Sequence, residues 1–156
     1  MVICGRLRVE KAKEKGDPVM IRPIICDPIL LMKPSRPASF VDREVIQDMK
    51  DTLKANSHKC VGMAANMIGV HKNIIIIHTE TGEDKVMINP VTVSQKDPYE
   101  TEEGCLSLPG VRKTTRYRVV TVRYEDESFK KHVETFSGFT AEIVQHEMDH
   151  LQGILI

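Results

Sequence analysis

The stretch QHEMDH at residues 145–150 decides how the rest of this 156-residue chain is interpreted. Residues four apart share one face of an α-helix, so His146 and His150 can both reach a single metal ion. Glu147 lies one step round the helix, where its carboxylate can contact metal-bound water without binding the metal. This HExxH pattern is typical of metallohydrolases in which the glutamate is the general base. Apolar residues on both sides of the stretch favour a buried helix over a solvated one.

Two histidines leave a metal site incomplete, because a catalytic ion usually takes a third protein ligand and keeps one position open for water. Besides the carboxylates, the candidates are Cys105, His58, His71, His78 and His132. Cys105 lies in EGCLSLPG at residues 103–110, where glycine and proline do not favour a plain strand. The residues alone leave open whether Cys105 is a ligand or a buried core thiol.

The composition is that of an ordinary globular chain, with an apolar fraction of 41%. Its length suggests a single domain, which we assign to residues 19–156. Residues 1–18 are charged, show no convincing period and are predicted to be an N-terminal extension. An alternative is that Met20 is the native start, because residues 13–17 can be encoded by purine-rich codons that resemble a ribosome-binding site.

Charge and hydropathy exclude several classes of partner. The 22 basic and 22 acidic residues cancel, so the composition gives no reason to expect a nucleic-acid or anionic-membrane surface. No apolar run is long enough to span a bilayer, and the N-terminus lacks a signal-peptide core. The four scattered cysteines form no CxxC pair and are expected to be free thiols or metal ligands. We therefore expect a cytoplasmic protein.

Apolar periodicity predicts helices at both ends of a β-rich middle. Residues 21–39 are rich in proline and are expected to be extended, and residues 57–69 are expected to be a loop of small residues. The predicted helices are 42–56 and 140–152, and the predicted strands are 73–78, 85–89, 91–95, 118–124 and 130–136. Most of these strands are expected to form hairpins. The pattern indicates the α+β class with an antiparallel sheet.

Three segments of the chain resemble the peptide deformylase family. EGCLS at residues 103–107 and QHEMDH at residues 145–150 match the second and third family motifs intact. The first family motif, GxGxAAxQ, aligns with CVGMAANM at residues 60–67. The resemblance covers the chain from about Ile21 to its end. It implies an α+β fold in which antiparallel β-sheets pack around a central metal-binding helix.

The resemblance also implies a function, the removal of the N-formyl group from the formylmethionine of nascent polypeptides. The implied metal ligands are Cys105, His146 and His150. The implied physiological ion is Fe(II), with Zn, Ni or Co able to replace it. Metal-bound hydroxide would attack the formyl carbon, and Glu147 would carry the proton to the leaving amine. The backbone N–H of Leu106 would stabilise the oxyanion.

The first motif departs from the family pattern at its end. Met67 stands where the family has a glutamine that donates to the oxyanion, and a thioether cannot donate a hydrogen bond. Losing one such donor typically costs about 100- to 1000-fold in rate. Asn66 could replace that donor only if the backbone turned it inward, and Cys60 replaces the first glycine of the motif. An alternative function is therefore a deformylase-like paralogue that binds metal but has weak or altered amidase activity.

Four further residues are assigned lesser roles. Gly62, Met67 and Ile143 are predicted to contact the substrate, with Gly62 offering backbone hydrogen bonds to a peptide added as a strand. Gln145 is predicted to support the metal ligands from behind. Simpler interpretations, namely a turn glycine, core packing and a solvated helix residue, stay open at this point. Some family members dock on the ribosome through a further C-terminal segment, and the chain stops soon after Gly153, so the resemblance does not extend to that route.

Overall fold

The computed structural model describes residues 18–156. The predicted extension at residues 1–18 lies outside the described residues except for its last position. The elements in chain order are α1 (Pro28–Leu31), the 3-10 turn η1 (Phe40–Asp42), α2 (Arg43–Ala55), β1 (Gly62–Ala64), the 3-10 turn η2 (Ala65–Ile68), β2 (Ile74–His78), β3 (Asp84–Gly104), β4 (Val111–Glu125), β5 (Lys131–Ser137) and α3 (Gly138–Leu151).

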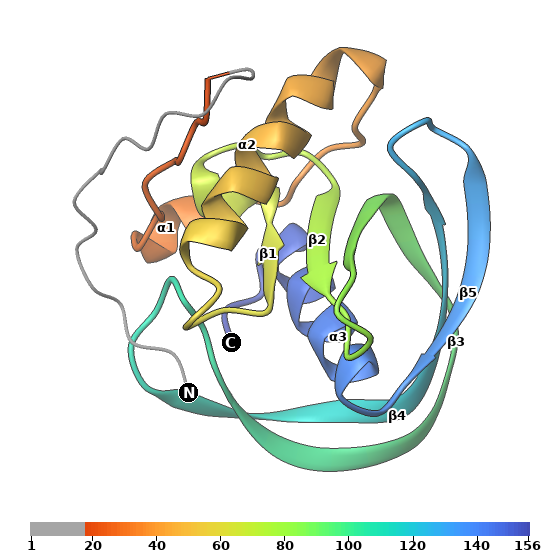
Figure 1. The fold of residues 1–156 in the computed structure, drawn as a ribbon. Coiled ribbons are helices and arrows are strands. Elements are labelled where there is room, and N and C mark those ends of the chain that lie inside the picture. The colour runs from red at the N-terminus through yellow and green to blue at the C-terminus, as the bar shows by residue number, and fades with distance from the viewer. Residues whose placement is uncertain (1–17) are drawn as a thin grey trace.

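The five strands form one antiparallel sheet in the order β1-β2-β3-β4-β5. Strands β3 and β4 are long and curve as a ribbon around the outside of the molecule (Figure 1). Helix α3 lies in the middle, and it contacts β1 and β2 as well as β4 and β5. This arrangement confirms the predicted α+β class with a central helix, although one curved sheet surrounds the helix.

The centre of the core is strand β2, in which Ile74, Ile75, Ile76 and Ile77 are each no more than 1% exposed. Both α2 and α3 contact this strand. A continuous β-branched run, with no alternation of polar residues, is what a strand with two buried faces requires. Helix α2 covers β2 with an apolar face whose buried members are Ile46, Met49, Thr52 and Leu53.

The expectation of a loop at residues 57–69 was wrong in its second half. Residues 62–68 are all buried and form β1 followed by η2. Strand β1 exists because Met63 pairs with Ile76 on β2, a contact between segments that no local pattern announces. The small side chains of Ala64 and Ala65 allow this segment to lie inside the core. Gly69 then ends the turn at φ 84°, a left-handed conformation that glycine adopts without strain.

Strands β3 and β4 are longer than predicted. The expected strands 85–89 and 91–95 are parts of a single strand, β3, in which Pro90 lies at a register shift between Ile88 and Val91. A second register shift lies between Thr92 and Ser94. The proline-rich N-terminal segment also holds one short helix, α1, which Asp27 caps by accepting a hydrogen bond from the Ile29 N–H. The predicted helices 42–56 and 140–152 agree with α2 and α3 to within two residues at each end.

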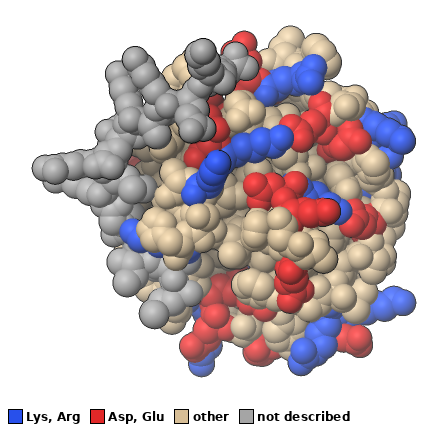
Figure 2. All heavy atoms as spheres, in the orientation of Figure 1, with Lys and Arg blue, Asp and Glu red and all other residues tan. Residues whose placement is uncertain are grey.

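Charged residues of both signs are interspersed over the face drawn in Figure 2, in keeping with the equal numbers of acidic and basic residues. Within residues 18–156, no helix is long and apolar enough to cross a membrane.

Candidate metal centre

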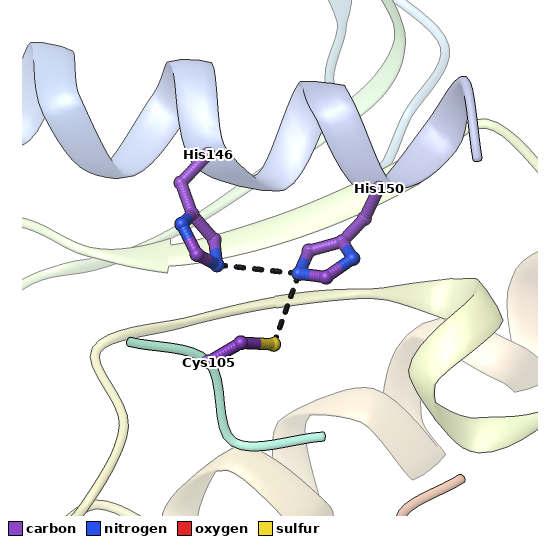
Figure 3. Close-up of side chains that lie close together, drawn as sticks. All are labelled: Cys105, His146 and His150. Atoms are coloured by element: carbon purple, nitrogen blue, oxygen red, sulfur yellow. Dashed lines mark hydrogen bonds between the residues drawn. The ribbon is translucent and has the colours of Figure 1, made fainter. Parts of the chain in front are cut away.

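Helix α3 holds its two histidines on the face that looks away from solvent. Ala141, Val144 and Leu151 are buried along the helix and fix its rotation against the sheet. His146 and His150, one turn apart, therefore both project into the interior, and their Nε2 atoms lie 3.2 Å apart (Figure 3). His150 is fully buried.

Cys105 reaches the same point from a different part of the chain. It follows Gly104, the last residue of β3, where the β3–β4 hairpin ends with the pair Gly104 and Val111. Its Sγ lies 3.2 Å from His150 Nε2 and points at the two imidazoles from the opposite side (Figure 3). The backbone N–H of Ser107 donates to this sulfur at 3.4 Å, which holds the thiol in place.

The three potential ligand atoms lie within 4.8 Å of one another. Two nitrogens bound tetrahedrally to one ion at about 2.0–2.1 Å would be about 3.3 Å apart, close to the 3.2 Å between His146 and His150. One thiolate and two imidazoles form a donor set that suits Fe(II), Zn, Ni or Co. The residues therefore fit a divalent metal ion.

A buried ion-pair cluster orients His146. Its Nδ1 lies 2.7 Å from Glu103 Oε2, and Glu103 accepts two hydrogen bonds of 2.7 Å from the Arg116 guanidinium. Arg116 also donates to Asp149 at 2.6 Å. Burial opposes the ionisation of Glu103, but the hydrogen bonds from Arg116 and His146 outweigh it and lower the pKa of Glu103 to about 2. The carboxylate thus holds the proton on Nδ1 and leaves Nε2 facing Cys105.

The two imidazoles have different protonation chemistry. Burial, together with the nearby charges of His146 and Arg116, lowers the pKa of His150 to about 3. His150 is therefore neutral, as a metal ligand must be. Burial also acts to lower the pKa of His146, but hydrogen bonds with Cys105 and Glu103 outweigh it and raise that pKa to about 10. His146 thus carries a second proton, which it would have to release to bind a metal ion.

Glu147 is a buried carboxyl group with one unsatisfied oxygen. It is 4% exposed, and its Oε2 atom has no hydrogen-bond partner. Burial raises the pKa of Glu147 to about 7. A carboxyl group with a pKa in this range can both accept and return a proton at neutral pH, which is the requirement for acid–base catalysis.

A cleft of about 450 Å³ connects these groups to solvent. One wall is the segment 60–62 with Met67, and the opposite wall is the segment 102–106. The start of α3 closes a third side. The predicted site residues that line the cleft are Gly62, Met67, Cys105, Leu106, Ile143, His146 and Glu147. The structure thus gathers residues from four separate stretches of sequence around one cavity.

Gly62 is a glycine for reasons of space. A Cβ atom on this residue would lie 2.7 Å from Glu147 Oε1 and 2.8 Å from Ile143 Cγ2. This contact brings β1 against α3 and places Glu147 beside the edge of the sheet. The simpler interpretation of Gly62 as a turn residue is therefore wrong, because it lies within β1.

The Gln145 side chain bonds to strand β4 and to its own helix. Its side-chain oxygen accepts from the Tyr117 N–H at 2.9 Å, and its amide donates to the carbonyls of Tyr117 and Ala141 at 2.9 Å. These bonds attach α3 to the middle of β4. Gln145 supports the site by fixing the helix on the sheet.

Asn66 does not take the place of the donor that Met67 lacks. Its amide donates to the His150 carbonyl at 2.8 Å, and Asn66 is not among the residues that line the cleft. Met67 is 1% exposed, and its sulfur accepts a hydrogen bond from the Ala64 N–H at 3.4 Å. Neither side chain therefore offers a donor to the cleft.

The other candidate ligands lie apart from the cluster. His58 lines the cleft and is exposed, and His71 bonds to the Leu30 carbonyl. His78 and His132 each pair with an aspartate on the surface. Sequence reasoning missed the roles of Arg116 and Asp149. The strand register pairs Glu103 with Arg112, not with Arg116. The Arg116–Glu103 ion pair therefore forms diagonally across the β3–β4 ribbon between residues that are not register partners, and no local signal could have found it.

Comparison with protein families gives a match over residues 21–156 to the model described as polypeptide deformylase. A protein named peptide deformylase from Clostridium beijerinckii is 52% identical over 137 residues, which cover 88% of this chain and 100% of the relative. Peptide deformylase 2 of Clostridium acetobutylicum is 40% identical, with 81% of this chain and 85% of the relative covered.

Solved structures give the same result. A peptide deformylase from Legionella pneumophila superposes with a TM-score of 0.79 and 38% identity, covering 86% of this chain and 83% of the other. A class I type b peptide deformylase from Acinetobacter baumannii, solved with Met-Ala-Ser bound, has a TM-score of 0.78 and 28% identity, with 88% and 96% covered.

Proposed function

This chain belongs to the polypeptide deformylase family, and from this we infer that it removes the N-formyl group from formylmethionine at the start of nascent polypeptides. The observation that carries this function is the meeting of Cys105, His146 and His150 beside the unpaired carboxylate oxygen of Glu147, at the base of one cleft. A hydrolase of formyl amides needs these two components within reach of one substrate.

Cys105, His146 and His150 are the residues that would hold one divalent metal ion. When bound, such an ion supplies a Lewis acid for the formyl oxygen and lowers the pKa of water. We propose Fe(II) as the physiological ion, with Zn, Ni or Co as replacements, because the thiolate and imidazole donors accept all of them. Glu103 would hold His146 in the orientation that binding requires.

Glu147 is the proposed acid and base of the reaction. Its buried carboxylate would accept a proton from the attacking water and deliver it to the amine that leaves. The backbone N–H of Leu106, directly after Cys105 on the cleft wall, is the proposed donor to the oxyanion. Proton transfer of this kind contributes typically about 10²- to 10⁴-fold to a rate.

Ile143, Met67 and Gly62 are the proposed contacts for the formylated peptide, and Gly62 would offer backbone hydrogen bonds to its extended chain. Each lines the cleft next to Glu147 or the metal ligands, and the two larger side chains give it an apolar surface. We place the reaction in the cytoplasm, where ribosomes release the formylated chains that are its substrate. The ribosome-bound nascent chain is therefore the partner that we propose.

The alternative of a paralogue with weak or altered amidase activity is not favoured. The chain is 52% identical to the peptide deformylase of Clostridium beijerinckii over that relative's whole length. The absence of a side-chain donor at Met67 makes the Leu106 backbone N–H more important for the oxyanion.

The test is an anaerobic assay of formate release from formyl-Met-Ala-Ser by protein loaded with Fe(II). We expect turnover by the wild type, and a loss of about 100-fold or more in kcat for Glu147→Gln with the metal content unchanged. Cys105→Ala should lose both metal and activity. His78→Gln, which changes a surface histidine, is the matched control and should keep wild-type rates. A Glu147→Gln variant as fast as the control would overturn the role of Glu147, and a wild type that releases no formate would overturn the function.

A further inference from the structure

Within residues 18–156, strand β1 is the edge of the sheet, and no other described strand pairs with one side of its backbone. In antiparallel pairs, hydrogen-bonded and non-bonded residues alternate. The Val61 carbonyl accepts from the His78 N–H at 2.7 Å, so the N–H and C=O groups of Gly62 and Ala64, the next alternate positions, point away from β2. They face the free edge, on the side where Gly62 lines the cleft.

Two of these outward backbone groups form hydrogen bonds with sulfur atoms. The Cys60 thiol donates to the Gly62 carbonyl, and Met67 Sδ accepts from the Ala64 N–H at 3.4 Å. Cys60 and Met67 both line the cleft. Burial and, to a smaller extent, the nearby Glu147 raise the pKa of the Cys60 thiol to about 12. The thiol therefore keeps its proton at neutral pH and remains a donor.

These bonds matter because the proposed substrate is a peptide. An extended peptide that joins an edge strand gains its affinity from backbone hydrogen bonds to the outward groups of that strand. Sulfur is a weak donor and a weak acceptor, so these two hydrogen bonds only partly block the outward backbone groups of β1. A peptide has to displace them before it can pair with β1 in full.

We propose that Cys60 and Met67 are specificity-determining residues that cap the free edge of β1. With the edge capped, this deformylase recognises the formylmethionyl residue and gains little affinity from the residues that follow it. The proposal rests on the deformylase function proposed above. It concerns the binding of the peptide backbone and assigns Cys60 no part in the chemical step.

The test compares two substrates, formyl-Met-Ala-Ser and formyl-Met-amide. The quantity measured is kcat/KM for formyl-Met-Ala-Ser divided by kcat/KM for formyl-Met-amide. In Cys60→Ala the Gly62 carbonyl loses its cap, so the ratio should rise about 2- to 10-fold, the value of one backbone hydrogen bond. Met67→Leu keeps the apolar volume but frees the Ala64 N–H, and should raise the ratio similarly. Cys60→Ser retains a donor, and its hydroxyl donates more strongly than the thiol, so its ratio should stay at or below the wild-type value. Cys26→Ala, an exposed cysteine outside the cleft, is the matched control.

A second measurement is independent of turnover. The affinity for the product Met-Ala-Ser, measured by calorimetry, should rise by the same factor in Cys60→Ala and Met67→Leu and should not rise in Cys60→Ser. An unchanged ratio and affinity in both capping variants would overturn the proposal. An equal fall in kcat on both substrates in Cys60→Ala would also overturn it, because the thiol would then act on the reacting carbonyl.

Two further results separate a failure of the capping proposal from a failure of the proposed function and from misfolding of a variant. If the wild type hydrolyses neither substrate, the proposed function fails, and calorimetry on Met-Ala-Ser alone decides the capping. If thermal melting shows that Cys60→Ala is unfolded, Met67→Leu carries the test, and an unchanged ratio there overturns the proposal.

Discussion

Among single residues, Gly62 is the position where the sheet and the metal helix are closest. A methyl group here would overlap both Glu147 and Ile143. We expect Gly62→Ala to displace the Glu147 carboxylate and to lower kcat by about 100-fold, the cost of a misplacement near 1 Å. Overpacking should also destabilise the fold by about 1–3 kcal/mol.

Steady-state kinetics and urea unfolding of Gly62→Ala check this prediction. Gly82→Ala is the matched control, because Gly82 has φ 86° in a surface turn with nothing within 4 Å of its position for a Cβ. Its backbone strain should cost about 1 kcal/mol and leave kcat unchanged. A wild-type kcat in Gly62→Ala would show that Glu147 does not need its observed position.

At the scale of elements, Arg116 joins β4 to β3 through Glu103 and to α3 through Asp149. The Arg116 and Glu103 side chains are 4% and 5% exposed. Removing one partner of a buried ion pair leaves the other charge uncompensated, so we expect Arg116→Met to lower the free energy of unfolding by about 3–5 kcal/mol. It should also loosen His146, because Glu103 would lose the partner that fixes it.

Urea unfolding measures this cost. Arg123→Met, an exposed arginine on the same strand, should change the free energy of unfolding by no more than about 0.5 kcal/mol. Adding Glu103→Gln to Arg116→Met should recover part of the loss, because the uncompensated charge is then gone. If the free energy of unfolding of Arg116→Met alone lies within 1 kcal/mol of the wild-type value, the ion-pair cluster of Arg116, Glu103 and Asp149 contributes nothing to the attachment of α3.

At the scale of the whole molecule, the metal site links the end of β3 to the last helix. A metal ion that binds the folded chain alone would stabilise it by about 2.7 kcal/mol at a concentration of 100 times Kd. For a domain of this size, each kcal/mol shifts Tm by roughly 2–4 °C. We therefore expect a chelator to lower Tm by about 5–11 °C.

Thermal melting with and without chelator is the measurement, and Cys105→Ala is the control. That variant lacks the ligand from β3, so its Tm should respond much less to the chelator. A wild-type Tm that does not change with chelator would argue against metal binding at this site.

The sequence by itself determined the features that depend on neighbours along the chain. Helical periodicity placed His146 and His150 on one face with Glu147 one step round the helix, and the dense isoleucine run predicted strand β2. Family resemblance then selected Cys105 among several candidate ligands. These predictions succeeded because a period of 3.6 residues or a run of β-branched side chains is a local property.

The tertiary structure alone decided the features that depend on strand pairing. Arg116 on β4 meets Glu103 on β3 diagonally, although the strand register pairs Glu103 with Arg112. The pairing of β1 with β2 turns an expected loop into an edge strand. The direction of Asn66, and the use of the Cys60 and Met67 sulfurs on the edge of β1, follow from that pairing. The physical reason is that the neighbouring strand decides which backbone N–H and C=O groups face outward. Here that neighbouring strand lies in another part of the sequence.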